Sequence, residues 1–582
     1  MLQLVFPIFD YNFIKKMKSK LLWIGLFFMT FACTDDSTEK LVASGGAVYG
    51  GELRLMSSEK IANLFPLSSE DVYEQRVNNQ IFESLLKIDQ TGTHVIPSLA
   101  ESFTISSDAK TFTFKIRKGV FFHSDDCFSD ENGREVIASD VQFCMQFACS
   151  GLPENKIGNL LINKIKGAKK FHNATNQTMK GQSVAGIKVL DDYTIEITLD
   201  ESFVGFDKIL THSNLGIFAP EAYEKYGKDV LKHPVGTGPF QIDTWNNNSL
   251  SLKRNPRYWK KDVYGNQLPF LDKVVLTYSK TKKDELLAFR KEKIDIILEI
   301  PANEIENTLG TLKEAQAGKN IKHKVDSKSS VSVNFFGFAT GVKPFNDVKV
   351  RKAFNIALDR NDLVINWMKG EGYPMLNGFV PAGSSYPTNK VNGFQFDVAK
   401  AKQLLAEAGY PNGAGFPVLD LYINTQTGSS TYELSKGIQN QLKENLNINV
   451  NIKLCSLKER ENAIKSGKAL IWKTGWVADY PDASNFLDLF YSGENSVFKS
   501  NPFQYNNAKF NALLEASMKE KDNNKRLDLL VQCDQIIIDE AVVMPVFNDD
   551  FITMVNAKVR NFETNSMEIL DFSTIFIKEP KK

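Results

Sequence analysis

The chain has 582 residues, of which 42% are hydrophobic and 24% charged, an ordinary composition for a soluble globular protein. This length predicts about two to four domains. The formal net charge of +1 gives no bulk field for nucleic acid or an anionic membrane surface, so we expect no nucleic-acid partner. His123 is a lone histidine with no second ligand at metal spacing, and no Cys-x-x-Cys pair occurs, so we expect no metal and no cofactor.

The N-terminal residues read as a targeting segment. A cluster of lysines precedes the apolar run 21–28, and the small residue Ala32 precedes Cys33. This order is typical of a secretory signal, and the run is too short to span a bilayer comfortably. Ala32-Cys33 resembles a lipoprotein box, in which Cys33 becomes the lipidated first residue of the mature protein. The alternative is an uncleaved membrane anchor, which the short apolar run disfavours.

The first half of the mature chain mixes predicted strands and helices. Residues 50–55 and 193–199 are predicted strands, and strict alternation over 111–117 predicts a half-buried strand. An apolar stripe predicts a helix over 71–86. We expect a second helix to begin with Ser139 as its N-cap.

A Gly-x-Gly pair at Gly236 and Gly238 invites a dinucleotide-loop interpretation. Pro239 and Phe240 follow, so the run lacks the helix N-terminus that a pyrophosphate needs, and the third glycine is missing. We therefore exclude a dinucleotide site here.

The second half reads as a separate α/β lobe. Residues 331–338 are apolar and β-like, Asp347 is expected to cap one helix, and Asp397 a second helix that ends at Ala408. A strand, a helix and a strand then follow in order, which predicts a βαβ unit with a right-handed crossover. These three elements are expected at 418–423, 438–446 and 448–454.

Residues 472–490 carry the most chemical information. Two tryptophans, a tyrosine and two phenylalanines crowd around a lysine and several aspartates, and Gly475 and Pro481 predict a loop rather than a helix. A carboxylate among aromatic side chains is partly screened from water, so a cation interacts with it strongly. We expect a pocket that holds a positively charged group on Asp479, with Trp476 as an apolar wall. The alternative is a surface turn whose aromatic residues fill a core and whose aspartates cap backbone amides.

Gly475, Trp476 and Asp479 resemble the Gly-Trp-x-x-Asp signature of the oligopeptide- and dipeptide-binding proteins of ABC importers, within bacterial extracellular solute-binding protein family 5. In that family the aspartate pairs with the α-ammonium group of a peptide. Further motifs agree in order, and the resemblance runs from about residue 50 to residue 559. These motifs are Ile81–Leu86, Gly236–Phe240 (a backbone crossing in relatives), Val350–Phe354 and Ala357–Arg360.

The resemblance implies an α/β fold like that of periplasmic binding proteins, with two α/β lobes, hinge strands and an extra domain inserted in the first lobe. Ligand would bind in the cleft, and the lobes would close over it. The expected boundaries are a signal peptide at 1–33, a polar tether at 34–48, lobe I at 49–86, 186–275 and 545–582, the inserted domain at 87–185, and lobe II at 276–544.

The expected ligand-binding residues centre on Asp479, with Glu83 as a contribution from the first lobe. Some relatives carry an arginine three residues before the tryptophan, where it can meet a peptide carboxylate. This chain has Lys473 there, a point charge without the two-pronged fork of arginine. The full expected set is Asp479, Trp476, Lys473, Val477, Tyr480, Asn485 and Glu83.

The implied function is capture without chemistry. A monomeric lipoprotein, anchored by lipid on the periplasmic or cell-surface side of a membrane, would bind peptides and deliver them to an ABC permease. The alternatives are a binder of another solute such as a nickel chelate or an oligosaccharide, a signalling receptor on the same fold, or an exported peptidase. The chain lacks His-Glu-x-x-His, a Gly-x-Ser-x-Gly elbow and a Gly-Lys-Ser/Thr phosphate loop, so we expect no enzyme. The 5 cysteines after Cys33 imply at least one free thiol.

Overall fold

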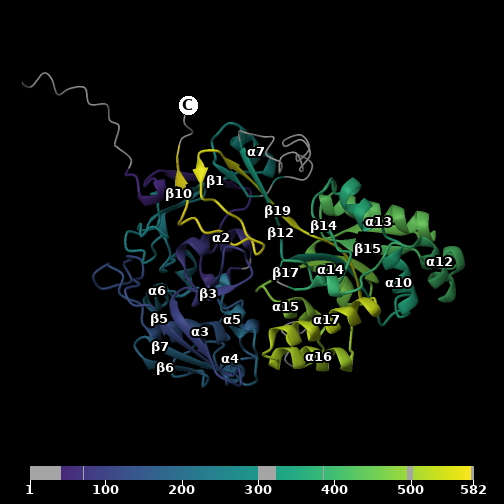
Figure 1. Ribbon diagram of the computed structural model, residues 1–582, viewed down its shortest axis with the longest axis horizontal. Helices are drawn as coiled ribbons and strands as arrows, with labels where there is room; N and C mark the ends of the chain where they lie inside the picture. Colours follow the sequence, from purple (N-terminus) through teal and green to yellow (C-terminus); the bar gives the residue numbers. More distant parts are fainter. Residues whose placement is uncertain are drawn as a thin grey trace, which may run out of the picture.

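A computed structural model of the chain describes residues 41–69, 71–298, 300, 323–383, 386–493 and 502–578. The predicted signal peptide, Cys33 and residues 34–40 of the polar tether lie outside the described residues. Figure 1 shows two lobes side by side: the purple-to-teal first part of the chain and its yellow end form lobe I, and the green-to-yellow part forms lobe II. No helix within the described ranges is both long and apolar enough to cross a membrane.

Lobe I contains two four-stranded sheets. The first has the order β1-β10-β9-β8, with β1 parallel to β10, and the second is the antiparallel sheet β4-β5-β7-β6. Alternate residues of β5 are buried, as the pattern of 111–117 predicts. The strands are β1 (Glu52–Ser57), β4 (Ala100–Ile105), β5 (Thr111–Ile116), β6 (Ile187–Asp191), β7 (Thr194–Thr198), β8 (Phe240–Trp245), β9 (Ser249–Arg254) and β10 (Lys273–Tyr278), with a separate hairpin of β2 (Leu86–Ile88) and β3 (Val95–Pro97).

Lobe II is built on one sheet of order β14-β18-β13-β17-β15-β16. The predicted βαβ unit is confirmed, because β15 and β16 pair in parallel on either side of α13 in the sequence. The strands are β13 (Ser332–Phe338), β14 (Tyr373–Pro374), β15 (Leu419–Ile423), β16 (Val450–Leu454), β17 (Ile471–Val477) and β18 (Val543–Asn548). The helices are α10 (Val348–Ile356), α11 (Arg360–Asp362), α12 (Val398–Glu407), α13 (Ser430–Leu446), α14 (Leu457–Lys465), α15 (Ala483–Leu487), α16 (Ala508–Lys519) and α17 (Asn523–Asp539).

Helix caps follow the sequence at some positions and not at others. Asp347 and Asp397 cap α10 and α12 as predicted, each accepting a backbone N–H of the first turn. The prediction of Ser139 as an N-cap is wrong: Ile137 occupies that position in front of α3, and Asp140 accepts its backbone N–H at 2.9 Å. Isoleucine has no side-chain acceptor, so the bond that a serine cap would accept from the first turn is absent, and the carboxylate of Asp140 supplies only the bond to the N–H of the cap residue. The lobe I helices are α2 (Val72–Ile81), α3 (Ala138–Cys149), α4 (Ala168–Ala174), α5 (Phe206–Ile209), α6 (Pro220–Tyr226) and α7 (Lys282–Arg290).

The chain crosses itself at the Gly236–Phe240 run, as in the family that the motif resembles. A Cβ on Gly236 would lie 2.1 Å from the carbonyl oxygen of Ile81, and one on Gly238 would lie 2.5 Å from that of Gln80. Only glycine allows backbones this close. The crossing is at the end of α2, which stops at Ile81 and not at residue 86. The buried His123 ring lies 3.0 Å from the Gly238 carbonyl through Nε2, which is consistent with a structural role.

Two long strands connect the lobes. β12 (His323–Ser329) and β19 (Asp550–Asn556) pair antiparallel along their length, and β11 (Ile296–Ile297) pairs with the other edge of β19. Figure 1 places β12 and β19 between the two lobes. They are therefore the hinge strands of the fold.

After β19 has passed from lobe II back towards lobe I, the C-terminal segment lies in lobe I. Gln80 in α2 donates from Nε2 to the carbonyl of Leu570 at 2.8 Å and accepts the backbone N–H of Phe572 at 3.0 Å. The short strands β20 (Val559–Arg560) and β21 (Phe576–Ile577) pair with each other in this segment. Lobe I is thus completed by the last residues of the described chain.

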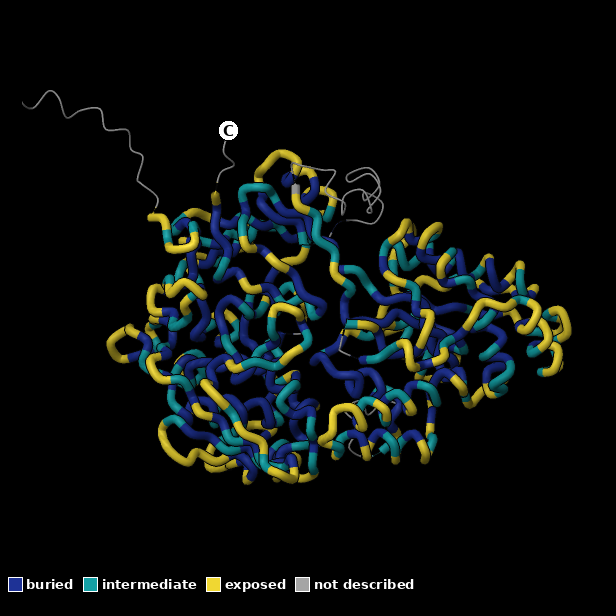
Figure 2. The backbone as a smooth tube through the Cα atoms, in the orientation of Figure 1, coloured by how far each residue is buried: buried dark blue, intermediate teal, exposed yellow. Residues whose placement is uncertain are grey.

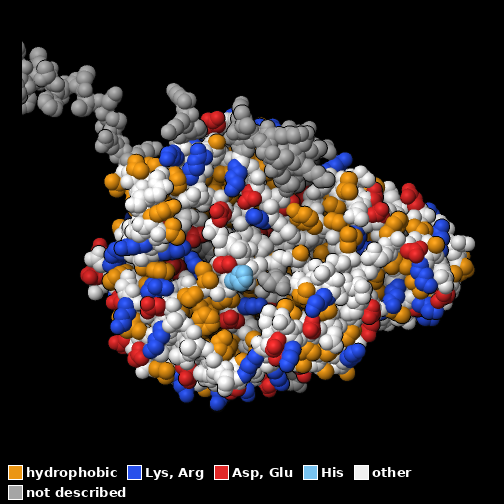
Figure 3. All heavy atoms as spheres, viewed as in Figure 1, with side chains coloured by type: hydrophobic (Ala, Val, Ile, Leu, Met, Phe, Trp, Pro, Cys, Tyr) orange, Lys and Arg blue, Asp and Glu red, His pale blue; other side chains and the backbone are white. Residues whose placement is uncertain are grey.

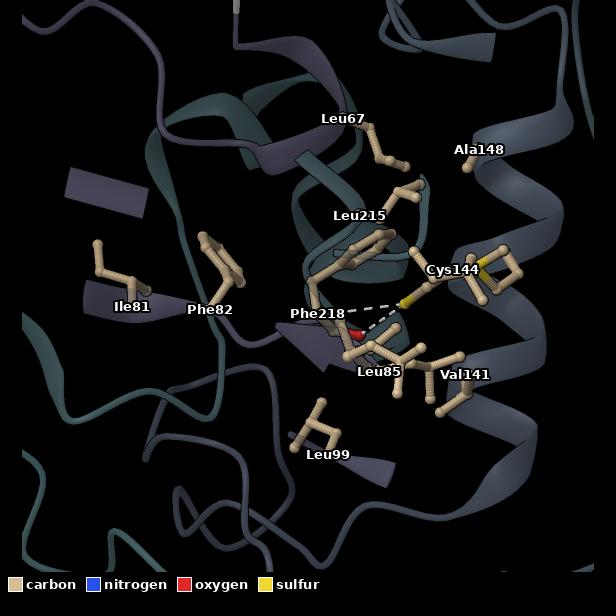
Figure 4. Close-up of a cluster of buried hydrophobic side chains, with 14 of the residues drawn as sticks. Leu67, Ile81, Phe82, Leu85, Leu99, Val141, Cys144, Ala148, Leu215 and Phe218 are labelled. Carbon is tan, nitrogen blue, oxygen red and sulfur yellow. Dashed lines mark hydrogen bonds between the residues drawn. The ribbon is translucent and has the colours of Figure 1, made fainter. Parts of the chain in front are cut away.

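Each lobe has its own buried interior, which Figure 2 shows in dark blue. The largest cluster belongs to lobe I, and Figure 4 shows Val141 and Cys144 of α3 beside Leu85 and Phe218 in it. The thiol of Cys144 donates to the carbonyl of Phe218 at 3.2 Å there. The described cysteines are all free, which confirms the expectation of at least one free thiol; they are Cys127, Cys144, Cys149, Cys455 and Cys533.

The structure differs from the expected domain boundaries at three places. The sheet of the expected inserted domain includes β6 and β7, so it continues to Thr198 and past residue 185. β18 lies in the lobe II sheet, although residues 545–582 were expected in lobe I, and α7 packs on β1 in lobe I although it falls within 276–544. The inserted domain itself stays a prediction.

Candidate ligand-binding site

The aromatic stretch begins as a strand and ends as a helix, so the prediction of a loop over 472–490 is wrong for 472–477 and 483–490 and correct for 478–482. β17 pairs antiparallel with β13 along its whole length, and α15 follows Asp482. Gly475 sits opposite Asn334, and a Cβ there would lie 3.1 Å from the Asn334 side-chain oxygen. The glycine marks a close approach inside a strand and not a turn.

The other edge of β17 is open beyond its first residues. Within the described chain, the pairing of β17 with β15 covers Ile471 and Trp472. The Lys473 carbonyl points to this open side, because it accepts a hydrogen bond from Arg460, which also bonds Asn424 at the end of β15. Backbone groups of alternate residues point the same way, so those of Gly475 and Val477 face the open edge too. Both residues are exposed, Val477 to 57%.

Asp479 follows β17 directly and is held by one asparagine of α15. Asn485 donates from Nδ2 to Asp479 Oδ2 at 3.2 Å and accepts the Asp479 backbone N–H at 3.1 Å. The same Asn485 oxygen accepts the Trp476 indole N–H at 2.8 Å. The predicted residues Asp479, Trp476 and Asn485 therefore form one hydrogen-bonded unit.

The ionisable neighbour of Asp479 comes from lobe I. His212 Nε2 lies 4.0 Å from Asp479 Oδ1. The Asn214 backbone N–H donates to His212 Nδ1 at 3.0 Å, which assigns the ring proton to Nε2, the nitrogen that faces the carboxylate. Burial raises the pKa of Asp479 and lowers the pKa of His212, as expected for two groups that lack a strong partner. The Asp479 side chain still keeps 29% of its surface exposed.

Asp482 stands in contrast three residues later. Arg526 binds both of its carboxylate oxygens, at 2.9 and 2.7 Å, and Lys208 in α5 reaches it across the lobes at 2.5 Å. Burial works to raise the pKa of Asp482, but these two cations hold that pKa well below its usual range. Asp482 is thus saturated by protein cations, and Asp479 is not: among the described residues, its ion-pair contact is the one with His212.

Lys473 and Tyr480 are placed differently from Asp479. Lys473 and Trp476 project to opposite faces of β17, and the Lys473 ammonium donates to the Asn334 side chain at 2.6 Å. Asn334 in turn donates to Asp549 at 2.9 Å, and burial lowers the pKa of Lys473 to about 8. Tyr480 is buried to 4% exposure and packs into the lobe I core cluster, while its hydroxyl interacts with the side chains of Ser484 and Asn485.

Two cavities flank the Asp479 region. A cavity of about 490 Å³ in lobe II is lined by Trp472, Trp476 and other residues around β17. A cavity of about 230 Å³ in lobe I includes Thr211 and Ser213, the neighbours of His212 in the sequence. Figure 3 shows acidic, basic and histidine side chains beside one another along the junction of the lobes.

Glu83 belongs to the lobe I cavity and not to the Asp479 unit. It accepts hydrogen bonds from the Thr237 hydroxyl at 2.9 Å, the Tyr258 hydroxyl at 3.1 Å and the Trp259 indole at 3.0 Å. Burial raises its pKa despite these donors. Its role as a ligand contact stays a prediction, and these hydrogen bonds give it a structural role, since it ties together the end of α2 and the segment after β9.

His212 is the contact that the sequence did not reveal. It lies in an irregular segment, with no chemistry-bearing residue at a recognisable spacing, and it meets Asp479 only through the packing of the two lobes. The arrangement as a whole offers an underpaired carboxylate, an open strand edge and an adjacent cavity. These three features suit a ligand with a cationic end and an extended main chain.

Comparison with known proteins agrees with this geometry. Residues 94–498 match the family described as bacterial extracellular solute-binding proteins, family 5 Middle. The chain is 25% identical over 530 residues to the glutathione-binding protein GsiB of Salmonella typhimurium, covering 90% of this chain and 93% of that one. It is 27% identical over 495 residues to the oligopeptide-binding protein OppA of Bacillus subtilis, covering 83% and 85%.

A solved structure supports the fold. The periplasmic oligopeptide-binding protein OppAIV from Borrelia burgdorferi superposes with a TM-score of 0.71 at 26% identity, covering 91% of this chain and all of that one (100%). The expected architecture of two α/β lobes, like that of periplasmic binding proteins, is therefore confirmed.

Proposed function

The chain belongs to family 5 of the bacterial extracellular solute-binding proteins, and from that premise we propose that it captures peptides between its lobes and delivers them to the permease of an ABC importer. Solute binding is the role of this family. The peptide ligand, the permease partner, the monomeric state and the lipid anchor at Cys33 are the specific parts of the proposal.

The observation that carries the proposal is the state of the Asp479 carboxylate. It is partly buried, fixed by Asn485 and without a lysine or arginine partner among the described residues, whereas Asp482 nearby has two such partners. A peptide α-ammonium group at Asp479 would complete the missing ion pair. Close charge pairs across an interface couple by roughly 1.5–7 kcal/mol.

The open edge of β17 supports recognition of the peptide main chain. An extended peptide laid along Gly475 and Val477 would add a strand, with hydrogen bonds that do not depend on side-chain identity. The neighbouring cavity of about 490 Å³ leaves room for side chains of different sizes. Such a site binds many peptides and not one.

The named relatives favour the same ligand class. OppA is an oligopeptide-binding protein and GsiB a glutathione-binding protein, and glutathione is itself a small peptide with a free α-ammonium group. Asp479 favours an amine over a nickel chelate or an oligosaccharide, because its carboxylate has no lysine or arginine partner among the described residues.

The test is titration calorimetry with peptides on the Asp479→Ala variant. We expect affinity to fall about a hundredfold, or ~2.7 kcal/mol, because the ammonium loses its counter-ion. Asp539→Asn, an exposed carboxylate of α17, is the matched control and should bind as the wild type does. Unchanged affinity in Asp479→Ala would refute the assigned role of this residue.

A further inference from the structure

The described chain begins with a turn that leaves two apolar side chains in solvent. Leu41 and Val42 are each more than half exposed. Hydrogen bonds nevertheless order the turn, since the Tyr49 N–H donates to the Leu41 carbonyl at 3.0 Å and Val42 pairs with Val48 in an antiparallel bridge. Single exposed apolar residues are common on proteins, so the surroundings of this turn decide whether it has a role.

A loop of lobe I presents two more apolar side chains. Val263 is 93% exposed and Tyr264 more than half exposed, at the tip of the loop 261–267. The Asp262 carboxylate fixes the tip, because it accepts the backbone N–H groups of Tyr264 at 2.9 Å and of Asn266 at 2.8 Å. The loop is therefore built to hold the Val263 side chain away from the protein interior.

The loop and the turn are bonded to each other. The Ser44 backbone N–H donates to the Asn266 side-chain oxygen at 3.1 Å, and the Asn266 amide donates to the Ser44 carbonyl at 2.8 Å. The Tyr264 ring covers Gly45, where a Cβ would lie 2.5 Å from it. The exposed apolar side chains thus lie close together at one end of lobe I. We call them the tether-side patch: Leu41, Val42, Val263 and Tyr264.

Two exposed lysines flank the tether-side patch. Lys261 pairs with Gln267 at the base of the loop, and Lys578 Nζ donates to the Gly46 carbonyl of the turn at 3.4 Å. Figure 3 shows hydrophobic and basic side chains beside one another at this end of lobe I. Valine, leucine and tyrosine beside lysine suit the boundary of a lipid bilayer, where apolar groups enter the acyl region and ammonium groups meet phosphates.

The position of the tether-side patch agrees with the proposed lipid anchor. Cys33 precedes Leu41 by eight residues. A chain of that length spans at most about 29 Å, so a lipid on Cys33 keeps this end of lobe I close to the bilayer. Figure 1 places the start of the described chain at the edge of lobe I that faces away from lobe II. A contact at this edge leaves lobe II free to move.

We propose that the tether-side patch lies against the lipid bilayer and holds lobe I in one orientation on the membrane surface. This contact rests on the lipid anchor of the proposed function and goes beyond it, because the anchor keeps the protein near the membrane and the patch sets its orientation. Lobe II then opens and closes on the hinge strands β12 and β19 while lobe I stays in place. The short tether and the flanking lysines favour the bilayer over a permease subunit as the occupant.

The experiment is flotation of the full mature chain with vesicles of phosphatidylethanolamine and phosphatidylglycerol. Cys33→Ser removes the lipid, so vesicle binding by this parent chain reports the protein surface alone. We expect Val263→Ser to lower the partition onto vesicles about threefold, and Val263→Ser with Tyr264→Ser about tenfold. Ile365→Ser with Val418→Ser is the matched control, because it removes two exposed apolar side chains from lobe II, and it should bind vesicles as the parent does.

A parent chain that does not float, or a Val263→Ser variant that floats equally well, would overturn the bilayer contact. An equal loss in the lobe II control would overturn it too, because binding would then belong to exposed apolar surface in general. Flotation only with vesicles that hold the permease would assign the patch to that protein and also overturn the bilayer contact.

Peptide titration of the same samples separates this contact from the proposed function. The variants should bind peptides as the parent does, which shows that they are folded. Loss of vesicle binding with peptide binding intact would overturn a role in neither folding nor capture, and supports the patch as the membrane contact. A parent chain that floats but binds no peptide would overturn the proposed function and leave the bilayer contact standing.

Discussion

Asp479 and Asp482 lie three residues apart, but their carboxylates differ in the charged partners that the protein provides. Asp482 has Arg526 and Lys208 as partners, which lie 44 and 274 residues away in the sequence. Asp479 has only Asn485 and a histidine at 4.0 Å among the described residues. The aromatic composition of the stretch predicts a cation site. Composition cannot tell which aspartate has no protein cation as a partner, because the cations that pair with Asp482 come from distant elements.

The raised pKa of Asp479 predicts that peptide affinity depends on pH. Burial lifts this pKa above the ordinary 3.8, and a bound ammonium group would lower it again. Binding should therefore be strongest where the free protein already holds Asp479 ionised, and should weaken as the pH falls through the raised pKa. Calorimetric titrations from about pH 4 to pH 8 measure this.

The isosteric variant Asp479→Asn is the control for that titration. It removes the ionisable group and keeps an oxygen for the Asn485 amide, so its weak residual affinity should vary little with pH. An equal pH dependence in the variant and the wild type would assign the effect to another group, His212 first among them.

At the scale of elements, periodic patterns in the sequence predicted helices and strands correctly, whereas a glycine taken as a turn signal gave a wrong prediction. The alternation of β5, the caps of α10 and α12 and the βαβ unit of lobe II were readable because each depends on its own residues. The sequence does not predict β17, because Gly475 within it is also typical of a turn. Its actual role, a close approach to Asn334 on the neighbouring strand, depends on a contact 141 residues away, between 334 and 475, that no local pattern contains.

The crossing at Gly236 gives a prediction on stability. Gly236→Ala would place a Cβ 2.1 Å from the Ile81 carbonyl oxygen, a backbone atom that cannot rotate away. We expect the free energy of unfolding to fall by about 3 kcal/mol or more, measured by urea denaturation. Gly119→Ala is the comparison, because that position has open space and a φ of +72° and should lose only about 1 kcal/mol of backbone preference.

At the scale of the whole molecule, side chains tie the lobes together across the proposed site. Lys208 bonds Asp482 and His212 faces Asp479, so residues of one short segment of lobe I meet the residues that follow β17 in lobe II. The hinge strands β12 and β19 allow the lobes to separate, and these ties favour the closed arrangement. The family resemblance predicted the lobes and the hinge, but neither tie, because each joins side chains from separate lobes.

Lys208→Met tests the first tie. The variant leaves Asp482 bound to both nitrogens of Arg526, so lobe II should remain folded while closure loses one contact. We expect a larger radius of gyration by small-angle X-ray scattering without peptide, and peptide affinity lower by a few-fold. Lys228→Met changes an exposed lysine of lobe I and should match the wild type in both measurements. Identical scattering from Lys208→Met would show that this tie has no part in closure.

The return of the C-terminal segment to α2 has a consequence for biogenesis. During synthesis, Leu570 emerges 490 residues after Gln80, so the contacts that complete lobe I form only after the strands of lobe II have been made. All strands of the lobe II sheet, of which β18 is the last in the sequence, are made before these residues, so that sheet can assemble earlier. Lobe I therefore stays incomplete until these residues have been made, and a truncation before Leu570 would remove the contacts that hold Gln80 of α2.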